Sequence, residues 1–266
     1  MQKTEKSLVK ANPKIKFVSM HYRRLKDLIP RSVRLKLPLL VATPIARMAL
    51  AYGRFRLWRR TDGRKGVERL DRVFVINLET RPDRLAAFTR EMERLEVVGV
   101  QRFDAISDVT GILGCTRSHA SCLKTMIDQS WHSMMVCEDD ARFLVSREDL
   151  DVLIEAFLND PEAEIACLAY NHIRRPRLRS ALFFRALETQ TAACYVIKET
   201  IATDLLRLLE EGADQLAAGG DRMLFGVDMV WKRLQTSRIF VIPTIRAVMQ
   251  ADGYSDIEHQ FVKYGV

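Results

Sequence analysis

The chain has 266 residues, of which 48% are hydrophobic, with 12 glycines and 8 prolines. This composition supports a substantial core and excludes a wholly disordered chain. The net charge of +8 is unevenly placed, because residues 1–70 carry 19 Lys/Arg against 4 Asp/Glu and the remainder carries 23 against 30. We therefore predict a basic N-terminal extension, residues 1–70, on a mildly acidic domain, residues 71–266.

The N-terminal extension is expected to be partly amphipathic and helical. Its first 34 residues lack the continuous apolar core of a secretory signal, and the apolar stretch 37–52 is too interrupted to span a membrane. Basic residues flank this stretch on both sides. Phe55 and Trp58 lie among the arginines that follow it, within residues 54–60. Cations with interleaved aromatic side chains suit an anionic membrane surface. The alternative is a helix packed on the domain; we expect no nucleic-acid partner, because no nucleic-acid-binding motif accompanies the basic residues.

The five cysteines form no Cys-x-x-Cys pair and lie mostly among apolar residues. This pattern favours reduced cysteines in a cytoplasmic protein over a disulfide framework or a zinc site. The cysteines are Cys115, Cys122, Cys137, Cys167 and Cys194.

The domain begins with a predicted strand, helix and strand. Residues 72–78 form a β-branched and aromatic run, Pro82 suits a first helical turn, and residues 97–103 read as a second strand. A β-α-β opening favours an α/β fold with a parallel sheet and crossover helices.

Polar residues follow the first predicted strand, where nucleotides bind in open α/β sheets. Arginine makes bidentate contacts to phosphate, and Asn or Asp can bind ribose or base edges. The glycine-rich motifs of dinucleotide folds and P-loops are absent from the sequence. We interpret four residues as donor contacts, the alternative being a charged helical turn in water: Asn77, Arg81, Asp83 and Arg84.

A second polar segment, residues 111–119, leads into a predicted helix. Gly114 allows close approach of another backbone, and the free amides of a helix start attract phosphate. Ser118 and His119 are expected in the first turns, facing the same crevice.

Three consecutive carboxylates, Glu138, Asp139 and Asp140, follow a short apolar run that reads as a buried strand. They repel one another unless a cation lies among them, and a hard divalent ion with oxygen ligands suits them. Side chains two apart on an extended chain point the same way, so Glu138 and Asp140 can share one ion while Asp139 faces elsewhere. An acidic loop in water is the alternative.

These segments together resemble glycosyltransferase family 25, which includes bacterial lipooligosaccharide-core sugar transferases and procollagen galactosyltransferases. The resemblance covers about residues 72–257. It is carried by Ile-Asn-Leu followed by Arg-Pro-Asp-Arg at 76–84, Gly-Cys-Thr-Arg-Ser-His at 114–119, Glu-Asp-Asp at 138–140, and Gln250 with Ser-Asp-Ile at 255–257.

The resemblance implies a GT-A-type fold, with a Rossmann-like mixed sheet flanked by helices, a nucleotide-sugar donor such as a UDP-hexose, and Mn²⁺ or Mg²⁺. It places the metal on Glu138 and Asp140 and the ribose or a donor hydroxyl on Asp139. Asp228 becomes a candidate base for the acceptor hydroxyl, although Asp also caps helices. From the tail, Asp256 and His259 are candidates to close over the metal or diphosphate.

The function expected from this resemblance is hexose transfer to a hydroxyl of a lipid-linked or cell-envelope glycan, such as the lipopolysaccharide (LPS) core. Inversion at the sugar is favoured, and the protein is expected to lie peripherally at the inner face of the cytoplasmic membrane. The alternatives are transfer to a protein side chain, or binding of nucleotide-sugars or glycans without turnover.

Overall fold

The computed structural model describes residues 31–60, 63–108, 110–172, 174–255, 257 and 260–263. The chain divides into two compact units, Met1–Ile45 and Ala46–Val266. Helix α2 (Arg31–Arg59) begins in the first unit and ends in the second. Among the described helices, none is long and apolar enough to cross a lipid bilayer.

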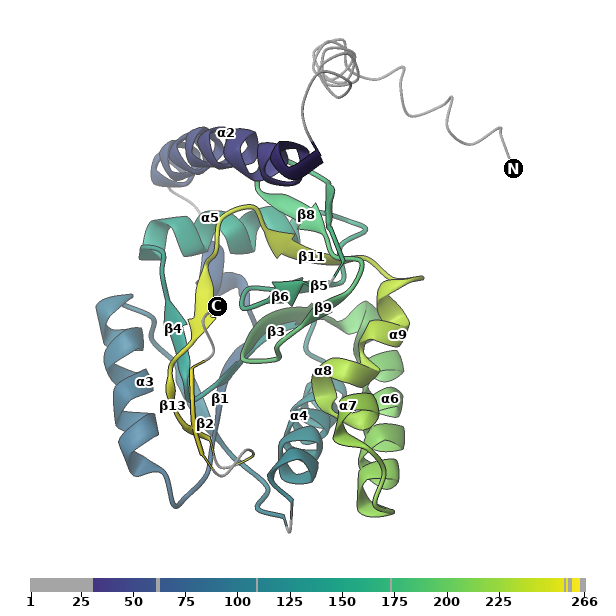
Figure 1. Cartoon of the computed structure of the whole chain (residues 1–266). Helices are drawn as coiled ribbons and strands as arrows, with labels where there is room; N and C mark the ends of the chain where they lie inside the picture. Colours follow the sequence, from purple (N-terminus) through teal and green to yellow (C-terminus); the bar gives the residue numbers. More distant parts are fainter. Residues whose placement is uncertain are drawn as a thin grey trace. The chain divides into compact units, whose positions relative to one another are not determined.

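The second unit is built on an eight-stranded mixed sheet with the order β2-β1-β3-β10-β5-β11-β8-β7. Figure 1 shows helices α3 and α4 beside its strands. Strand β1 is parallel to β2 and β3, whereas β10 is antiparallel to both β3 and β5. The predicted α/β class, a mixed sheet flanked by helices, is confirmed. The strands are β1 (Arg72–Asn77), β2 (Val100–Asp104), β3 (Ser133–Glu138), β5 (Ile165–Cys167), β7 (Arg177–Leu178), β8 (Phe183–Arg185), β10 (Cys194–Lys198) and β11 (Phe240–Pro243).

The predicted β-α-β opening is present. Helix α3 (Pro82–Arg94) connects β1 to β2, with Pro82 at its first position, where the missing N–H costs no intrahelical bond. Its residues Phe88 and Met92 are buried, and Val73 pairs with Val100 in parallel register. Local sequence signals therefore determine this part of the fold.

Helices cover both faces of the sheet. Helices α3 and α5 (Arg147–Leu158) contribute to one core, while α4 (Gly111–Asp128) packs against α6 (Glu199–Ala217). Short helices follow α6: α7 (Arg222–Phe225), α8 (Val227–Val230) and α9 (Lys232–Gln235). A 3-10 helix, η2 (Gly66–Arg69), precedes β1.

Three small two-stranded sheets complete the described part of the chain. One of them joins the segment after the acidic triplet to the C-terminal region, because β4 (Ala141–Phe143) pairs with β12 (Val248–Gln250). The others are β6 (Asn171–His172) with β9 (Thr189–Gln190), and β13 (Gly253–Ser255) with β14 (Gln260–Val262).

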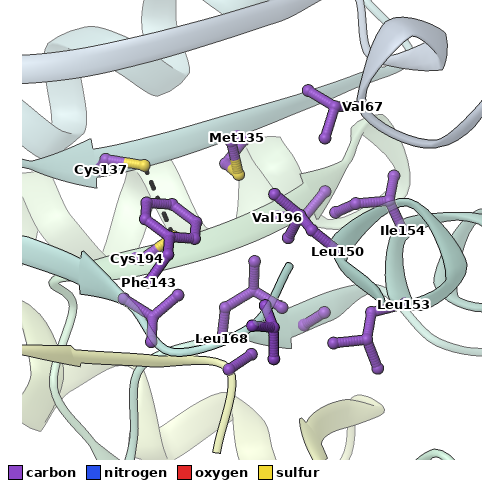
Figure 2. Packing of buried hydrophobic residues seen from close by; sticks show 14 of the residues in the cluster. Val67, Met135, Cys137, Phe143, Leu150, Leu153, Ile154, Leu168, Cys194 and Val196 are labelled. Atoms are coloured by element: carbon purple, nitrogen blue, oxygen red, sulfur yellow. Dashed lines mark hydrogen bonds between the residues drawn. The ribbon is translucent and has the colours of Figure 1, made fainter. Parts of the chain in front are cut away.

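The hydrophobic core lies between the central strands and α5 (Figure 2). Met135 and Cys137 of β3 and Val196 of β10 are fully buried there. Cys137 faces Cys194 across the strands, with their Sγ atoms 3.5 Å apart, and all five cysteines are free thiols. This packing holds the carboxyl end of β3, where the acidic triplet begins.

Candidate active site

A pocket of about 250 Å³ lies at the carboxyl ends of β1 and β3. In open α/β sheets, ligands bind at such strand ends. The loop between β2 and α4, the first half of α4, and the C-terminal segment complete its wall. The polar residues that line the pocket are Arg84, Ser107, Asp108, Cys115, Ser118, His119, Glu138, Asp139, Asp140, Gln250 and Ser255.

All three acids of the triplet line this pocket. Strand β3 ends at Glu138, and the chain turns through Asp139 and Asp140 before β4 begins. The alternation of an extended strand therefore stops at Glu138, and Asp139 does not face elsewhere as the alternation predicted. The triplet brings three carboxylates to one cavity.

Asp139 is held by two of the residues that we interpreted as donor contacts. Its Oδ2 accepts a hydrogen bond from Asn77 Nδ2 at 2.7 Å, and its Oδ1 accepts one from Arg84 Nη1 at 3.0 Å. Burial raises the pKa of Asp139, and the contacts with Asn77 and Arg84 oppose this effect. Asn77 is itself oriented, because its Oδ1 accepts from Arg102 Nε at 3.1 Å. Asp139 is thus a carboxylate of fixed orientation.

Asp140 is deeply buried and has only part of its hydrogen-bonding capacity used. Its Oδ2 accepts from Gln250 Nε2 at 3.1 Å, with Arg84 Nη1 at 3.8 Å. Its Oδ1 is buried and has no hydrogen-bond partner among the described residues. Burial, reinforced by the charge of Glu138, raises the pKa of Asp140 to about 7. A buried carboxylate oxygen without a donor fits a cation as its partner.

Glu138 contacts two side chains of α4. His119 Nε2 lies 3.2 Å from Glu138 Oε1, and Cys115 Sγ lies 3.7 Å from the same oxygen. On its other side, His119 Nδ1 lies 3.1 Å from the hydroxyl of Tyr195. A neutral imidazole that donates from Nε2 to the carboxylate must accept at Nδ1, so Tyr195 donates to His119. Tyr195, His119 and Glu138 form a buried chain that ends at the pocket.

Two sets of candidate metal ligands share Glu138. The ligand atoms of Cys115, His119 and Glu138 lie within 4.8 Å of one another, and nitrogen and sulfur ligands of this kind suit Zn²⁺. Glu138 and Asp140 instead offer oxygen ligands, which suit Mn²⁺ or Mg²⁺.

Ser118 and Gly114 join the loop after β2 to α4. Ser118 Oγ accepts from Ile106 N at 2.8 Å and donates to Gly114 O at 2.7 Å. A Cβ atom on Gly114 would lie 2.3 Å from Ile106 O, so the predicted close backbone approach is present. Helix α4 begins at Gly111, which places Ser118 and His119 in its third turn; their expected position in the first turns is wrong.

Arg81 and Asp83 lie away from the pocket lining. Their side chains form an ion pair at 3.0 Å, and Asp83 is exposed. The hydrogen bond from Arg81 lowers the pKa of Asp83. The structure brings Asn77 and Arg84 together at the acids, whereas Arg81 and Asp83 pair with each other.

Asp228 lies in the first turn of α8, whose N-cap is Gly226. Its Oδ2 accepts from the backbone N–H of Thr191 at 3.1 Å, and Thr191 has a φ of 81°, which is rare outside glycine. Burial raises the pKa of Asp228, and the charge of Glu138 raises it further. Asp228 is therefore a partly buried carboxylate that is hydrogen-bonded to the backbone directly after β9. It lies close enough to Glu138 for their charges to interact.

Asp256 and His259, the predicted closing residues, lie outside the described residues. Three further site residues were not predicted as such: Cys115, Tyr195 and Gln250. The four-residue spacing of Cys115 and His119 is a helical signal that points to one face. Gln250 is part of the motif with Ser-Asp-Ile at 255–257, but no contact was predicted for it. No local pattern marks Tyr195 as a site residue.

The family model described as glycosyltransferase family 25 (LPS biosynthesis protein) matches residues 109–217. This match confirms the resemblance read from the motifs, over the segment that contains α4, the acidic triplet and β10. Among curated proteins, none matches the chain.

The solved structures to which this chain is similar include the following three. A glycosyltransferase involved in the glycosylation of the major capsid of PBCV-1 has 8% identity and a TM-score of 0.42, covering 71% of this chain and 96% of that one. Mannosyltransferase PcManGT from Pyrobaculum calidifontis, in complex with GDP-Man and Mn²⁺, has 15% identity and a TM-score of 0.38, with coverage of 82% and 68%. Mannose-1-phosphate geranyltransferase from Thermus thermophilus has 9% identity and a TM-score of 0.40, with coverage of 72% and 74%.

Proposed function

We propose that this chain, whose residues 109–217 match glycosyltransferase family 25, transfers a hexose from a UDP-sugar to a hydroxyl of a lipid-linked or cell-envelope glycan such as the LPS core. The observation that carries the proposal is the pocket with three carboxylates, in which Asp140 Oδ1 is buried without a hydrogen-bond donor among the described residues. A lipid-linked acceptor would place the reaction at the inner face of the cytoplasmic membrane.

Glu138 and Asp140 would hold Mn²⁺ or Mg²⁺ through oxygen ligands, with Asp256 and His259 as further candidates from the tail. Two observations support the fit of such an ion. The ligand atoms are carboxylate oxygens. Burial and the charge of Glu138 raise the pKa of Asp140, and a bound cation would reverse this effect. When bound, such an ion supplies positive charge for the diphosphate that leaves the sugar. In this proposal, Asp140 is the main metal ligand.

The donor would bind along the β1 and α4 side of the pocket. Arg84 carries a guanidinium between Asp139 and Asp140, where it can also contact a phosphate oxygen. Asp139, held by Asn77, has a fixed orientation in which it can accept from a ribose or sugar hydroxyl. Ser118 and His119 shape the wall rather than offer free donors, because their polar atoms are already paired.

Asp228 would remove the proton of the acceptor hydroxyl. Its raised pKa makes the carboxylate a stronger base than an exposed aspartate, which suits proton transfer near neutral pH. The hydrogen bond from Thr191 N fixes the position of Oδ2 of this carboxylate. Attack by the activated hydroxyl on the face of the sugar opposite the diphosphate would invert the anomeric centre.

The experiment is release of UDP from a panel of UDP-hexoses by the purified full chain, with and without Mn²⁺, for the wild type and Asp140→Asn. We expect slow, Mn²⁺-dependent hydrolysis of one donor, at least a hundredfold slower in the variant. Asp128→Asn is the matched control, because Asp128 is an exposed acid at the end of α4 that pairs only weakly with Lys124 at 3.6 Å. Absence of both donor hydrolysis and calorimetric UDP binding would refute the proposal.

A further inference from the structure

The part of α2 that belongs to the second unit buries one face against the domain. Ala46 and Leu50 are fully buried, and Gly53 lies so close to α5 that a Cβ atom there would be 2.5 Å from Val152 Cγ1. Arg54 forms an ion pair with Asp149 at 2.5 Å. The spacing of residues 46, 50, 53 and 57 places these positions on one side of the helix. Residues 46–59 are therefore fixed on the domain surface, with a defined outer face.

The outer face is also apolar. Met48, Tyr52, Phe55 and Trp58 recur at helical spacing on the side opposite Ala46 and Leu50, and they are 74%, 64%, 51% and 78% exposed. A surface helix normally presents polar residues to water. A row of four large, exposed apolar side chains on one helix face indicates an interaction surface. We call these four residues the outer stripe.

Cations flank the outer stripe, and α2 contains no acidic residue. On the helix circumference, Arg47 and Arg54 lie on one side of the stripe and Arg56 lies on the other. The guanidinium of Arg59 lies 5.7 Å from the centre of the Phe55 ring. Within the described residues, neither Arg47 nor Arg56 has an ion-pair partner. The face thus combines apolar anchors with uncompensated positive charge.

We propose that the outer stripe docks on an anionic lipid bilayer, with residues 46–59 of α2 lying parallel to its surface. Met48 and Phe55 would enter the boundary between headgroups and acyl chains, while the arginines contact lipid phosphates. Tyr and Trp are the side chains that favour this boundary. A second copy of the chain is a poorer partner, because a two-fold contact would bring the arginines of both copies together. This surface does not depend on the proposed reaction, since none of its residues lines the pocket at the acids.

The test is sedimentation of the full chain with phosphatidylcholine vesicles that contain either no phosphatidylglycerol or about a third of it. We expect binding only to the anionic vesicles, with loss at high salt. Phe55→Ser with Trp58→Ser should weaken binding at least tenfold. Arg47→Gln with Arg56→Gln should weaken it about 25-fold, at roughly fivefold for each cation. Val98→Ser is the control, because Val98 is 85% exposed on the loop between α3 and β2, outside α2, and this variant should bind as the wild type does.

Insertion of the stripe itself is measured by quenching of tryptophan fluorescence with brominated phosphatidylcholine in the anionic vesicles. Trp58 should be quenched, and Trp58→Phe should lose the quenched component, which distinguishes docking of this face from binding by residues 1–30 alone. Wild-type binding by the Phe55→Ser, Trp58→Ser variant, or absence of quenching, would overturn the proposal. So would a dimer, seen by analytical ultracentrifugation without lipid, that this variant abolishes.

Discussion

His119 Nε2 lies 3.2 Å from Glu138 Oε1, and both groups belong to elements that the fold fixes independently. His119 is fully buried on α4, and Glu138 ends β3, which lies between β1 and β10 in the sheet. The imidazole therefore contacts Oε1 of Glu138, a residue that lines the pocket. Because Tyr195 Oη lies 3.1 Å from His119 Nδ1, the orientation of the ring depends on a residue of a third element, β10.

Removal of the Tyr195 hydroxyl should weaken metal binding without dismantling the site. In Tyr195→Phe the ring can still stack on His119, whose ring centre is 5.7 Å away, but Nδ1 loses its donor. Groups that orient a metal ligand typically contribute ten- to hundredfold to metal affinity. We expect Mn²⁺ affinity, measured by calorimetry, to fall by about that factor.

Tyr170→Phe provides the matched control for this variant. Tyr170 is also a buried tyrosine that donates a hydrogen bond, to Pro243 O at 3.0 Å, but it does not line the pocket. Loss of the Tyr170 hydroxyl should lower the free energy of unfolding by about 1 kcal/mol, as loss of the Tyr195 hydroxyl does, and should leave Mn²⁺ affinity unchanged. Equal Mn²⁺ affinity in wild type and Tyr195→Phe would show that the chain through His119 does not position Glu138.

Cys115→Ser distinguishes the two sets of candidate metal ligands that share Glu138. Burial raises the pKa of the Cys115 thiol well above its usual value, and neighbouring acids raise it further. A protonated thiol is a poor ligand, and Mn²⁺ prefers oxygen. We expect the variant to bind Mn²⁺ within about twofold of the wild type and to lose any Zn²⁺ binding. A large loss of Mn²⁺ affinity would place the ion on Cys115, His119 and Glu138 instead of on the acidic triplet.

The sequence predicted the elements of the fold better than the contacts of the site. Apolar runs and Pro82 mark β1, α3 and β3 locally, and the triplet at the end of β3 was correctly expected to meet a crevice. The contacts of Tyr195 and Gln250 join residues 76 and 110 positions apart. Such pairs depend on the antiparallel insertion of β10 and on the pairing of β12 with β4, which no local periodicity encodes.

The role of the triplet residues also depended on where the strand ends. Alternation predicts that Asp139 points away from Glu138 only if the chain stays extended. The turn after Glu138 removes that condition, and Asn77 and Arg84 then hold Asp139 in the pocket. A sequence pattern identified the acids, but the backbone direction at their position determined what each one faces.

Gly114→Ala should destabilise the protein although alanine is the better helix former. In an ordinary helix interior this change gains about 1 kcal/mol. Here the new Cβ would lie 2.3 Å from Ile106 O, a backbone atom that cannot rotate away, and such overpacking typically costs about 1–3 kcal/mol. Urea unfolding should show a net loss of stability, together with slower UDP release because the loop lines the pocket. Gly253→Ala is the control, because no atom lies within 4 Å of the position of its Cβ, and it should change neither the stability nor the rate of UDP release. An unchanged urea midpoint for Gly114→Ala would contradict the close packing of Gly114 against Ile106 O.

Asp160→Asn should reduce stability at neutral pH but not in strong acid. Hydrogen bonds from Arg179, at 2.7 Å to each carboxylate oxygen, are the main cause that lowers the pKa of Asp160 to about 2 from 3.8. Because the folded state holds this proton less tightly than the unfolded state, the stabilisation is complete above about pH 4 and disappears as the pH falls through 2. Its size corresponds to about 2 kcal/mol.

Asparagine keeps the Oδ1 acceptor for the backbone N–H groups of Glu162 and Ala163, so this variant removes mainly the charge facing Arg179. Urea unfolding at pH 7, 5, 3 and 2 should give a difference from wild type that is constant from pH 7 to 5 and shrinks toward pH 2. The exposed pair of Asp128 with Lys124 should show almost no such dependence, because exposed ion pairs contribute little. A difference for Asp160→Asn that stays constant down to pH 2 would mean that the lost stability comes from packing and not from the charge.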